Sequence, residues 1–148
     1  EAEAFDVITL SHVIEHLHDP VQALRDCRRL LRPGGWLWLE TPNVDSLGHQ
    51  VFGANWRGLE APRHLVLFSS RSLRQALETA GFAAPTAMRS PSPRQWIFER
   101  SLAIAEARLP DDGGPMPTAL RRQVTWADLG ESADSPCREF LTVVACRD

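Results

Sequence analysis

The order of elements within residues 5–43 restricts the fold more than any other feature of the chain. Residues 5–10, "FDVITL", form an apolar, β-branched run typical of a strand buried on both faces. Asp19 and Pro20 favour a helix start, because Asp is a preferred N-cap and Pro suits the first helical position. After a "PGG" helix stop, residues 36–43, "WLWLETPN", predict a second buried strand. This strand, helix and strand form a βαβ unit, so the two strands should be parallel.

The rest of the chain predicts further helices and strands of less regular spacing. The segment 44–68 is broken repeatedly by glycine and proline, so no long element is expected there. Beyond it we expect a helix at 69–80, a short strand near 82–88, helices near 95–109 and 118–129, and a closing strand within "EFLTVVACRD". Helices that alternate with strands indicate an α/β fold.

Composition limits the class of protein and its partners. The 148 residues are 43% hydrophobic and 24% charged, which is ordinary for one soluble globular domain. A net charge of -3 argues against a nucleic-acid partner, and the absence of a long apolar run argues against a membrane partner. The three cysteines lack C-x-x-C spacing, and no signal peptide opens the chain. We therefore expect free thiols and a cytoplasmic location.

Three stretches together resemble one enzyme family. "FDVITLSHVIEHLHDPVQALRDCRRLLRPGGWLWLETPN" resembles the second half of class I S-adenosylmethionine-dependent methyltransferases. "WRGLEAPRHLVLFSSRSLRQALETAGF" is similar to the small-molecule subgroup that resembles ubiquinone-biosynthesis enzymes, and "LTVVACRD" resembles the last, antiparallel strand of the family. The resemblance implies a Rossmann-like half-sheet, with strands equivalent to the fourth to seventh of the family and flanking helices. It also implies S-adenosylmethionine as cofactor and methyl transfer to a small molecule.

The family's first half has no counterpart in the pattern of this sequence. Its members begin with a strand, a glycine-rich turn and an acidic residue that binds the ribose. The nine glycines here form no such turn, and only four residues precede the fourth strand. We therefore expect residues 1–148 to be the C-terminal part of a single methyltransferase domain that binds the cofactor weakly or not at all by itself, with impaired methyl transfer. The alternative is a non-catalytic Rossmann-like fragment that serves as an interaction module.

The same comparison predicts an exposed strand edge. In the complete fold the first strand pairs beside the fourth, so without it residues 5–10 present an apolar edge with unpaired backbone groups. Such edges promote pairing between chains. We expect the chain to self-associate through residues 5–10.

A cluster of histidines and carboxylates follows the first strand, in "SHVIEHLHDP", residues 11–20. His12, Glu15 and His16 match the H-x-x-E-H pattern of one class of zinc peptidase. That chemistry needs a continuous helix that places both histidines on one face. A strand that ends at Ser11 and a new helix shortly afterwards leave room for barely one turn, which disfavours the peptidase.

The methyltransferase resemblance assigns different roles to the same residues. They lie just past the carboxyl end of a strand, which is where ligands bind in open α/β sheets. The resemblance implies that Ser11 and His12 line the methionine side of the cofactor pocket. Glu15 and His16 would then face the substrate cleft.

A metal-assisted methyltransferase is a further possibility. Some relatives carry E-x-x-E-H at this point and use it to hold a divalent cation, whereas here His12 replaces the first glutamate and Glu15 and His16 match. His64 or His49 would supply a further ligand, and imidazoles suit transition metals. In the simplest alternative, Glu15 pairs locally and His16 packs under the next helix, so no metal is assigned.

His64, in "PRHL", has two interpretations as well. It can act as a general base or, with Arg63, hold an anionic substrate; alternatively, the segment only folds over the pocket as a lid. Loops near strand ends often carry function. We therefore take Glu15, His16 and His64 as the candidate catalytic residues, with one of the histidines as the base.

Overall fold

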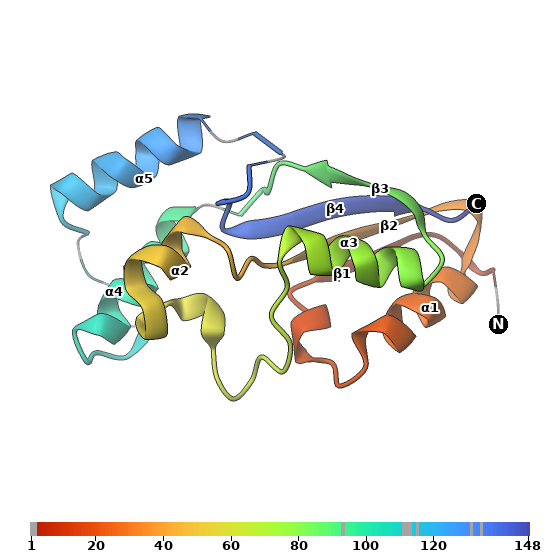
Figure 1. The fold of residues 1–148 in the computed structure, drawn as a ribbon, viewed down its shortest axis with the longest axis horizontal. Coiled ribbons are helices and arrows are strands. Elements are labelled where there is room, and N and C mark those ends of the chain that lie inside the picture. The colour runs from red at the N-terminus through yellow and green to blue at the C-terminus, as the bar shows by residue number, and fades with distance from the viewer. Residues whose placement is uncertain (1–2, 93, 111–113, 115, 131, 134) are drawn as a thin grey trace.

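A computed structural model describes residues 3–92, 94–110, 114, 116–130, 132–133 and 135–148 (Figure 1). Four strands, five α-helices and three short 3₁₀ helices are described in these ranges. In chain order they are β1 (Phe5–Ser11), η1 (Ile14–His16), α1 (Pro20–Leu30), β2 (Leu31–Pro42), α2 (Leu47–Phe52), η2 (Gly53–Asn55), η3 (Arg57–Leu59), α3 (Ser70–Thr79), β3 (Ala83–Met88), α4 (Arg94–Ala105), α5 (Thr118–Gly130) and β4 (Phe140–Cys146).

The strands form one mixed sheet in the order β1-β2-β4-β3. β1 and β2 are parallel, as the βαβ pattern predicts, and β4 is antiparallel to both β2 and β3. The expected α/β half-sheet with flanking helices is therefore confirmed. Because β1 and β2 run in the same direction, their carboxyl ends lie together, and Ser11 is in register with Glu40.

Local signals explain the helices that hold the sheet. Asp19 accepts a hydrogen bond from the Gln22 amide and caps α1, and Ser69 caps α3 through a capping box with Ser72. β2 begins five residues earlier than predicted. Its "PGG" turn is already paired with the end of the chain, where the Gly34 amide donates to the Arg147 carbonyl.

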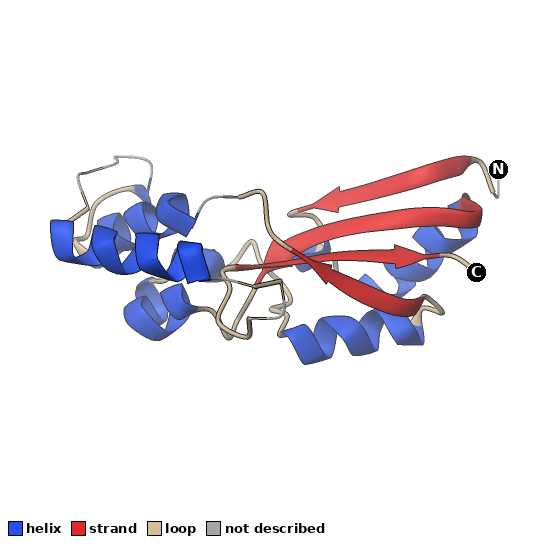
Figure 2. Ribbon diagram, turned by 90° about the horizontal axis from the view of Figure 1, so that it is seen from above, coloured by secondary structure: helices blue, strands red, loops and turns tan. Residues whose placement is uncertain are grey.

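Among the residues that the structure describes, helices cover one face of the sheet. α1 and α3 lie against this face, while α2, α4 and α5 gather beyond one end of the sheet (Figures 1 and 2). Ile8 and Leu10 of β1 pack into the helix-covered core, but Val7 is 56% exposed and its register partner Trp36 is 49% exposed. The expectation that residues 5–10 are buried on both faces is therefore wrong. Alternate residues of β1 instead face away from the helices.

A second, smaller core lies among the helices beyond the sheet. Its largest members are Trp56, Phe98 and Phe140, and the last of these joins it to the start of β4. In the part of the chain that the structure describes, no helix has both the length and the apolar character needed to cross a bilayer.

Candidate functional site

The candidate site lies at the carboxyl ends of β1 and β2, where η1 meets the loop before α3. The carbonyl of Glu15 accepts hydrogen bonds from the amides of Leu65 (2.8 Å) and Val66 (3.1 Å). This pairing draws the loop against η1 and brings His64 beside Glu15. Residues distant in the sequence are thereby placed in one cluster.

Glu15, His16 and His64 form the centre of this cluster. One ligand-type atom from each of the three lies within 4.8 Å of the other two. His16 and His64 contact edge to face, with ring centroids 4.7 Å apart, and Nε2 of His64 lies 4.0 Å from Oε1 of Glu15. All three candidate catalytic residues are therefore adjacent, although their roles remain predictions.

Backbone carbonyls orient both imidazole rings. Nδ1 of His16 donates to the Arg63 carbonyl at 2.9 Å, and Nδ1 of His64 donates to the Gly58 carbonyl at 2.7 Å. A neutral imidazole that donates from Nδ1 has its lone pair on Nε2. Gly58 suits this position because a Cβ there would lie 2.2 Å from the ring of Trp56.

His12 takes a separate position between two buried carboxylates. Its Nδ1 lies 3.4 Å from Glu15 and its Nε2 lies 3.4 Å from Glu40, and these two partners raise the pKa of His12 to about 9. At neutral pH it is therefore an imidazolium with no lone pair for a metal. Its φ of 52° also ends the strand, and η1 has only three residues. The continuous helix of the peptidase pattern does not form.

Glu40 is a site residue that the sequence analysis did not single out. It is 1% exposed at the end of β2, and it accepts hydrogen bonds from Ser90 (2.7 Å), Ser92 (2.6 Å) and Thr142 (2.7 Å). Burial raises the pKa of Glu40, but the hydrogen bonds outweigh it and bring the pKa to about 2. The sequence did hold a signal for Glu40: it is the single acid in the apolar stretch "WLWLETPN". A buried charge needs hydrogen-bond or ionic partners, so such an acid marks a polar site.

Two adjoining hollows open beside these residues. One, of about 250 Å³, is lined by polar groups that include His12, Glu15 and His64, and the other, of about 280 Å³, is lined partly by Ser92. His12, Trp96 and Phe140 line both. The hollows thus place an apolar wall opposite the charged cluster, which suits a small organic molecule.

Three residues proposed from the sequence line neither hollow: His16, which borders them only through its contact with His64, and Ser11 and His49. Ser11 is exposed at the end of β1 and lines neither of them. His49 is turned away from the cluster: its ring stacks on Trp56 at 5.0 Å, and its Nδ1 donates to the Val44 carbonyl at 2.6 Å. His49 is therefore not among the residues that can join a metal site with Glu15.

Comparison with known proteins identifies the class. The methyltransferase domain family matches residues 1–86. The structure also resembles a SAM-dependent methyltransferase from Thermotoga maritima, described as a possible histamine N-methyltransferase, with a TM-score of 0.59 and 18% identity over 100% of this chain and 58% of that one. The fold is that of a Rossmann-like methyltransferase. The chain belongs to the class I S-adenosylmethionine-dependent methyltransferases.

Curated relatives match over part of their length. The chain is 34% identical to the tRNA U34 carboxymethyltransferase of Chromohalobacter salexigens over 126 residues, which is 78% of this chain and 38% of that protein. It is 35% identical to the ubiquinone biosynthesis O-methyltransferase of Paraburkholderia phymatum over 85 residues, or 56% of this chain and 36% of that protein. The chain therefore spans well under half the length of these two relatives.

Proposed function

We propose that this chain contributes the substrate side of a methyltransferase that transfers a methyl group from S-adenosylmethionine to a small molecule. The supporting observation is the meeting of Glu15, His16 and His64 at the carboxyl end of β1. Ligands of open α/β sheets bind at that end of the strands. The roles of these three residues as catalytic groups are part of the proposal.

The residues near β1 fit one end of the cofactor. S-adenosylmethionine would supply an electrophilic methyl group on a positively charged sulfur. Oε1 of Glu15 is buried without a hydrogen bond, and Glu15 and Glu40 together place two carboxylates against the single imidazolium of His12. This net negative charge favours a cationic group nearby. We place the methionine end of the cofactor beside Ser11 and His12.

The residues that the structure describes offer no matching site for the ribose and adenine. The sequence contains no glycine-rich turn of the family's type, and β1 is an edge strand, paired with β2 on one side and with no strand on the other in the described sheet. We therefore propose that residues 1–148 act as the C-terminal part of a single domain and bind the cofactor weakly by themselves. The free state of all three cysteines is consistent with a proposed cytoplasmic location.

The chain's own contribution to the reaction is orientation and proton transfer. Nε2 of His16 or His64 carries the lone pair that would accept a proton from the attacking group of the substrate. Glu15 beside these rings would stabilise the imidazolium that results. Trp96 and Phe140 would hold the apolar part of the substrate.

Calorimetric titration with S-adenosylhomocysteine tests this proposal. We expect weak, measurable binding by the isolated chain, and loss of that binding in Glu15→Gln. His18→Gln, a change at an exposed histidine, serves as the matched control and should bind as the original chain does. If Glu15→Gln left the binding unchanged, the cofactor would have to bind outside this cluster. No binding by a folded sample would favour the non-catalytic fragment.

The orientation of the two rings supports a second candidate, a metal-assisted methyltransferase. Histidines that bind metals commonly donate their other ring N–H to a backbone carbonyl, as His16 and His64 do here. Together with Glu15 they offer two nitrogens and one oxygen, a set that suits a transition metal. The remaining coordination positions would be open to substrate oxygens.

Titration with Co²⁺, followed by its visible absorption, tests the metal candidate. One ion should bind, and His64→Gln should abolish the spectrum, whereas His49→Gln should leave it intact because that ring lies outside the cluster. A spectrum that needs His49 or one that is absent from the folded chain would rule this candidate out.

We also propose that the chain self-associates through residues 5–10. Within the described sheet β1 is at an edge, and Phe5 and Val7 are 49% and 56% exposed. An apolar edge strand with unpaired backbone groups pairs readily with another chain.

A further inference from the structure

A buried carboxyl group, that of Glu139, lies where the sheet meets the helices beyond its end. Glu139 directly precedes β4 and is 2% exposed. Its Oε1 accepts a hydrogen bond from the Gly48 amide of α2 at 2.6 Å, and its Oε2 accepts one from Nε1 of Trp56 at 3.2 Å. A Cβ at Gly48 would lie 2.6 Å from Oε2 of Glu139, so glycine is needed for this close approach. One carboxyl group therefore joins the start of β4 to α2 and to the turn between η2 and η3.

The segments joined at Glu139 also form walls of the two hollows of the candidate site. Phe140, the next residue, lines both hollows, and Gly58, two residues after Trp56, lines one of them. Trp56 and Phe140 also pack in one apolar core with Ile97, a residue of α4 that lines the same hollow as Gly58. Glu139 itself lines neither hollow, so it can act on them only through these neighbours.

The charged and titratable groups around Glu139 come from three helices. Nε of Arg94, in α4, lies 3.9 Å from Oε1 of Glu139 and 3.4 Å from Oδ1 of Asp128 in α5. His49 of α2 stacks on the ring of Trp56, with centroids 5.0 Å apart. A change of charge at Glu139 therefore meets Arg94 directly, and Asp128 and His49 through one intervening side chain.

The two protonation states of Glu139 hold their neighbours differently. When the group is ionised, both oxygens accept, and hydrogen bonds to a charged acceptor are shorter and stronger. When it is protonated, one oxygen carries a hydrogen and becomes a donor, which matches an approaching N–H group poorly. Burial raises the pKa of Glu139 to about 7, although the Gly48 amide and Arg94 lower it, so both states occur near neutral pH.

We propose that Glu139 is a positioning residue of the candidate site, whose charge sets how closely Trp56 and Phe140 are held together and thereby shapes the walls of the hollows. Ionisation strengthens the bond to Trp56, which is the longer of the two, and draws η2 and η3 toward β4. Protonation weakens that bond and lets the segments separate. The inference rests on the proposed function in taking the hollows as the place of the substrate.

A neutral hydrogen bond connects the same segment to α4. The Arg57 amide, in η3, donates to the hydroxyl of Ser101 in α4 at 2.9 Å. Trp96, on the same helix, lines both hollows and is 44% exposed. A displacement of η3 is therefore passed to α4, and the indole of Trp96 can report it.

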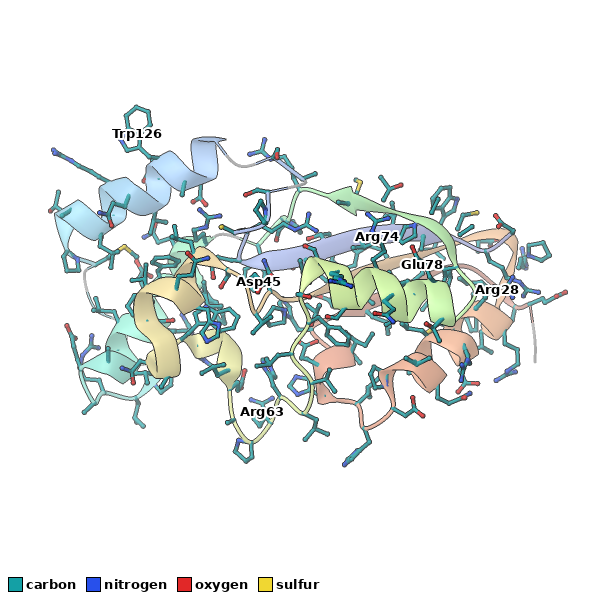
Figure 3. The ribbon with its side chains drawn as sticks, in the orientation of Figure 1. Arg28, Asp45, Arg63, Arg74, Glu78 and Trp126 are labelled. Atoms are coloured by element: carbon teal, nitrogen blue, oxygen red, sulfur yellow. The ribbon has the colours of Figure 1, made fainter. Side chains whose placement is uncertain are left out.

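Proton–nitrogen NMR of the indole N–H groups across neutral pH tests this coupling in the folded chain. The Nε1–H proton of Trp56 should move downfield as Glu139 ionises, and the Trp96 signal should move with the same midpoint of about 7. Trp126 projects outward from α5 (Figure 3) and is 74% exposed, so its signal should stay in place. Glu139→Gln, which does not titrate, should remove the shared response.

Two further kinds of variant separate other causes. Histidines also titrate near neutral pH, so the shared response should persist in His49→Gln, next to Trp56, and in His64→Gln, in the hollow. Trp56→Phe keeps an aromatic ring but has no N–H to donate. In this variant the Trp96 signal should lose its response, although Glu139 can still ionise.

Three outcomes would overturn the proposal. The first is a Trp96 signal that ignores pH in the original chain, even if Trp56 responds, because Glu139 would then act only locally. The second is a Trp96 response that is unchanged in Glu139→Gln, and the third is one that survives in folded Trp56→Phe. None of these measurements involves the cofactor or a methyl acceptor, so their failure is distinct from a failure of the proposed function in the titration with S-adenosylhomocysteine.

Discussion

His16 and His64 contact each other edge to face, with ring centroids 4.7 Å apart and an interplanar angle of 62°. Each ring is fixed by a backbone carbonyl at Nδ1, from Arg63 and Gly58 respectively. The geometry therefore fixes Nδ1 as the donor in each ring, so a neutral ring has its lone pair on Nε2, which in His64 lies 3.5 Å from Oε2 of Glu60. This lone pair is needed both by a general base and by a metal ligand.

Nitrogen NMR of the histidine rings should show the Nδ1–H tautomer for His16 and His64 when the rings are neutral. His18, which is exposed, should show the mixture typical of a solvated imidazole and serves as the internal reference. An Nε2–H tautomer at either of the first two positions would contradict the hydrogen-bond assignment.

Glu139 should make the stability of the fold depend on pH. Burial raises its pKa to about 7 from an ordinary 4.5, although the Gly48 amide, Arg94 and Trp56 oppose the rise. The protonated form is favoured in the folded state, so its contribution is full below pH 4.5 and is lost as the pH rises through 7. The loss amounts to at most about 3 kcal/mol.

Urea unfolding of the original chain and of Glu139→Gln between pH 4.5 and 8 measures this effect. The stability of the original chain should fall relative to that of the variant across this range, because glutamine does not titrate. Parallel curves for the two proteins would mean that Glu139 is ionised throughout.

Thr142→Val should destabilise the fold by about 1–3 kcal/mol, because it removes a buried hydroxyl donor from an ionised carboxylate. The Thr142 hydroxyl donates to Glu40 at 2.7 Å and is fully buried. The same change at Thr9, which is exposed on β1, should have little effect. Unfolding free energies from urea titration make the comparison. Equal effects at the two positions would show that the bond to Glu40 contributes nothing.

Val7→Lys should reduce self-association. The lysine places a charge on the exposed side of the edge strand, a substitution that blocks pairing between edges. Val51→Lys, on α2 at a similar exposure of 50%, is the matched control and should associate as the original chain does. Light scattering over a concentration series measures both. If light scattering showed that the original chain is a monomer throughout the series, self-association through residues 5–10 would be contradicted.

Sequence signals were sufficient where structure depends on near neighbours. The Asp19 cap, the Ser69 cap and the alternation of strands with helices placed α1, α3 and the parallel pair β1 and β2 correctly. The caps and the hydrophobic spacing of each element depend on residues a few positions apart, so a single sequence contains them, and a strand-helix-strand order makes the two strands parallel. The family resemblance supplied the antiparallel direction of the last strand.

Features that depend on distant contacts could not be predicted in the same way. The apolar run at residues 5–10 was expected to be buried on both faces, but nothing in that run says how many faces a helix covers. The carboxylate of Glu40 accepts hydrogen bonds from the hydroxyls of Ser90, Ser92 and Thr142, which follow it in the chain by at least 50 residues. Only the folded sheet brings these groups together.

Two amides that donate to the carbonyl of Glu15 can report, by hydrogen exchange, whether the candidate site is assembled. That oxygen accepts hydrogen bonds from the amides of both Leu65 and Val66. These two bonds hold the loop that carries His64 against the backbone of Glu15. Whenever this loop lifts away, the two amides meet solvent and exchange their hydrogens with it. Their exchange rates therefore measure how often the cluster is dismantled, even before any substrate is known.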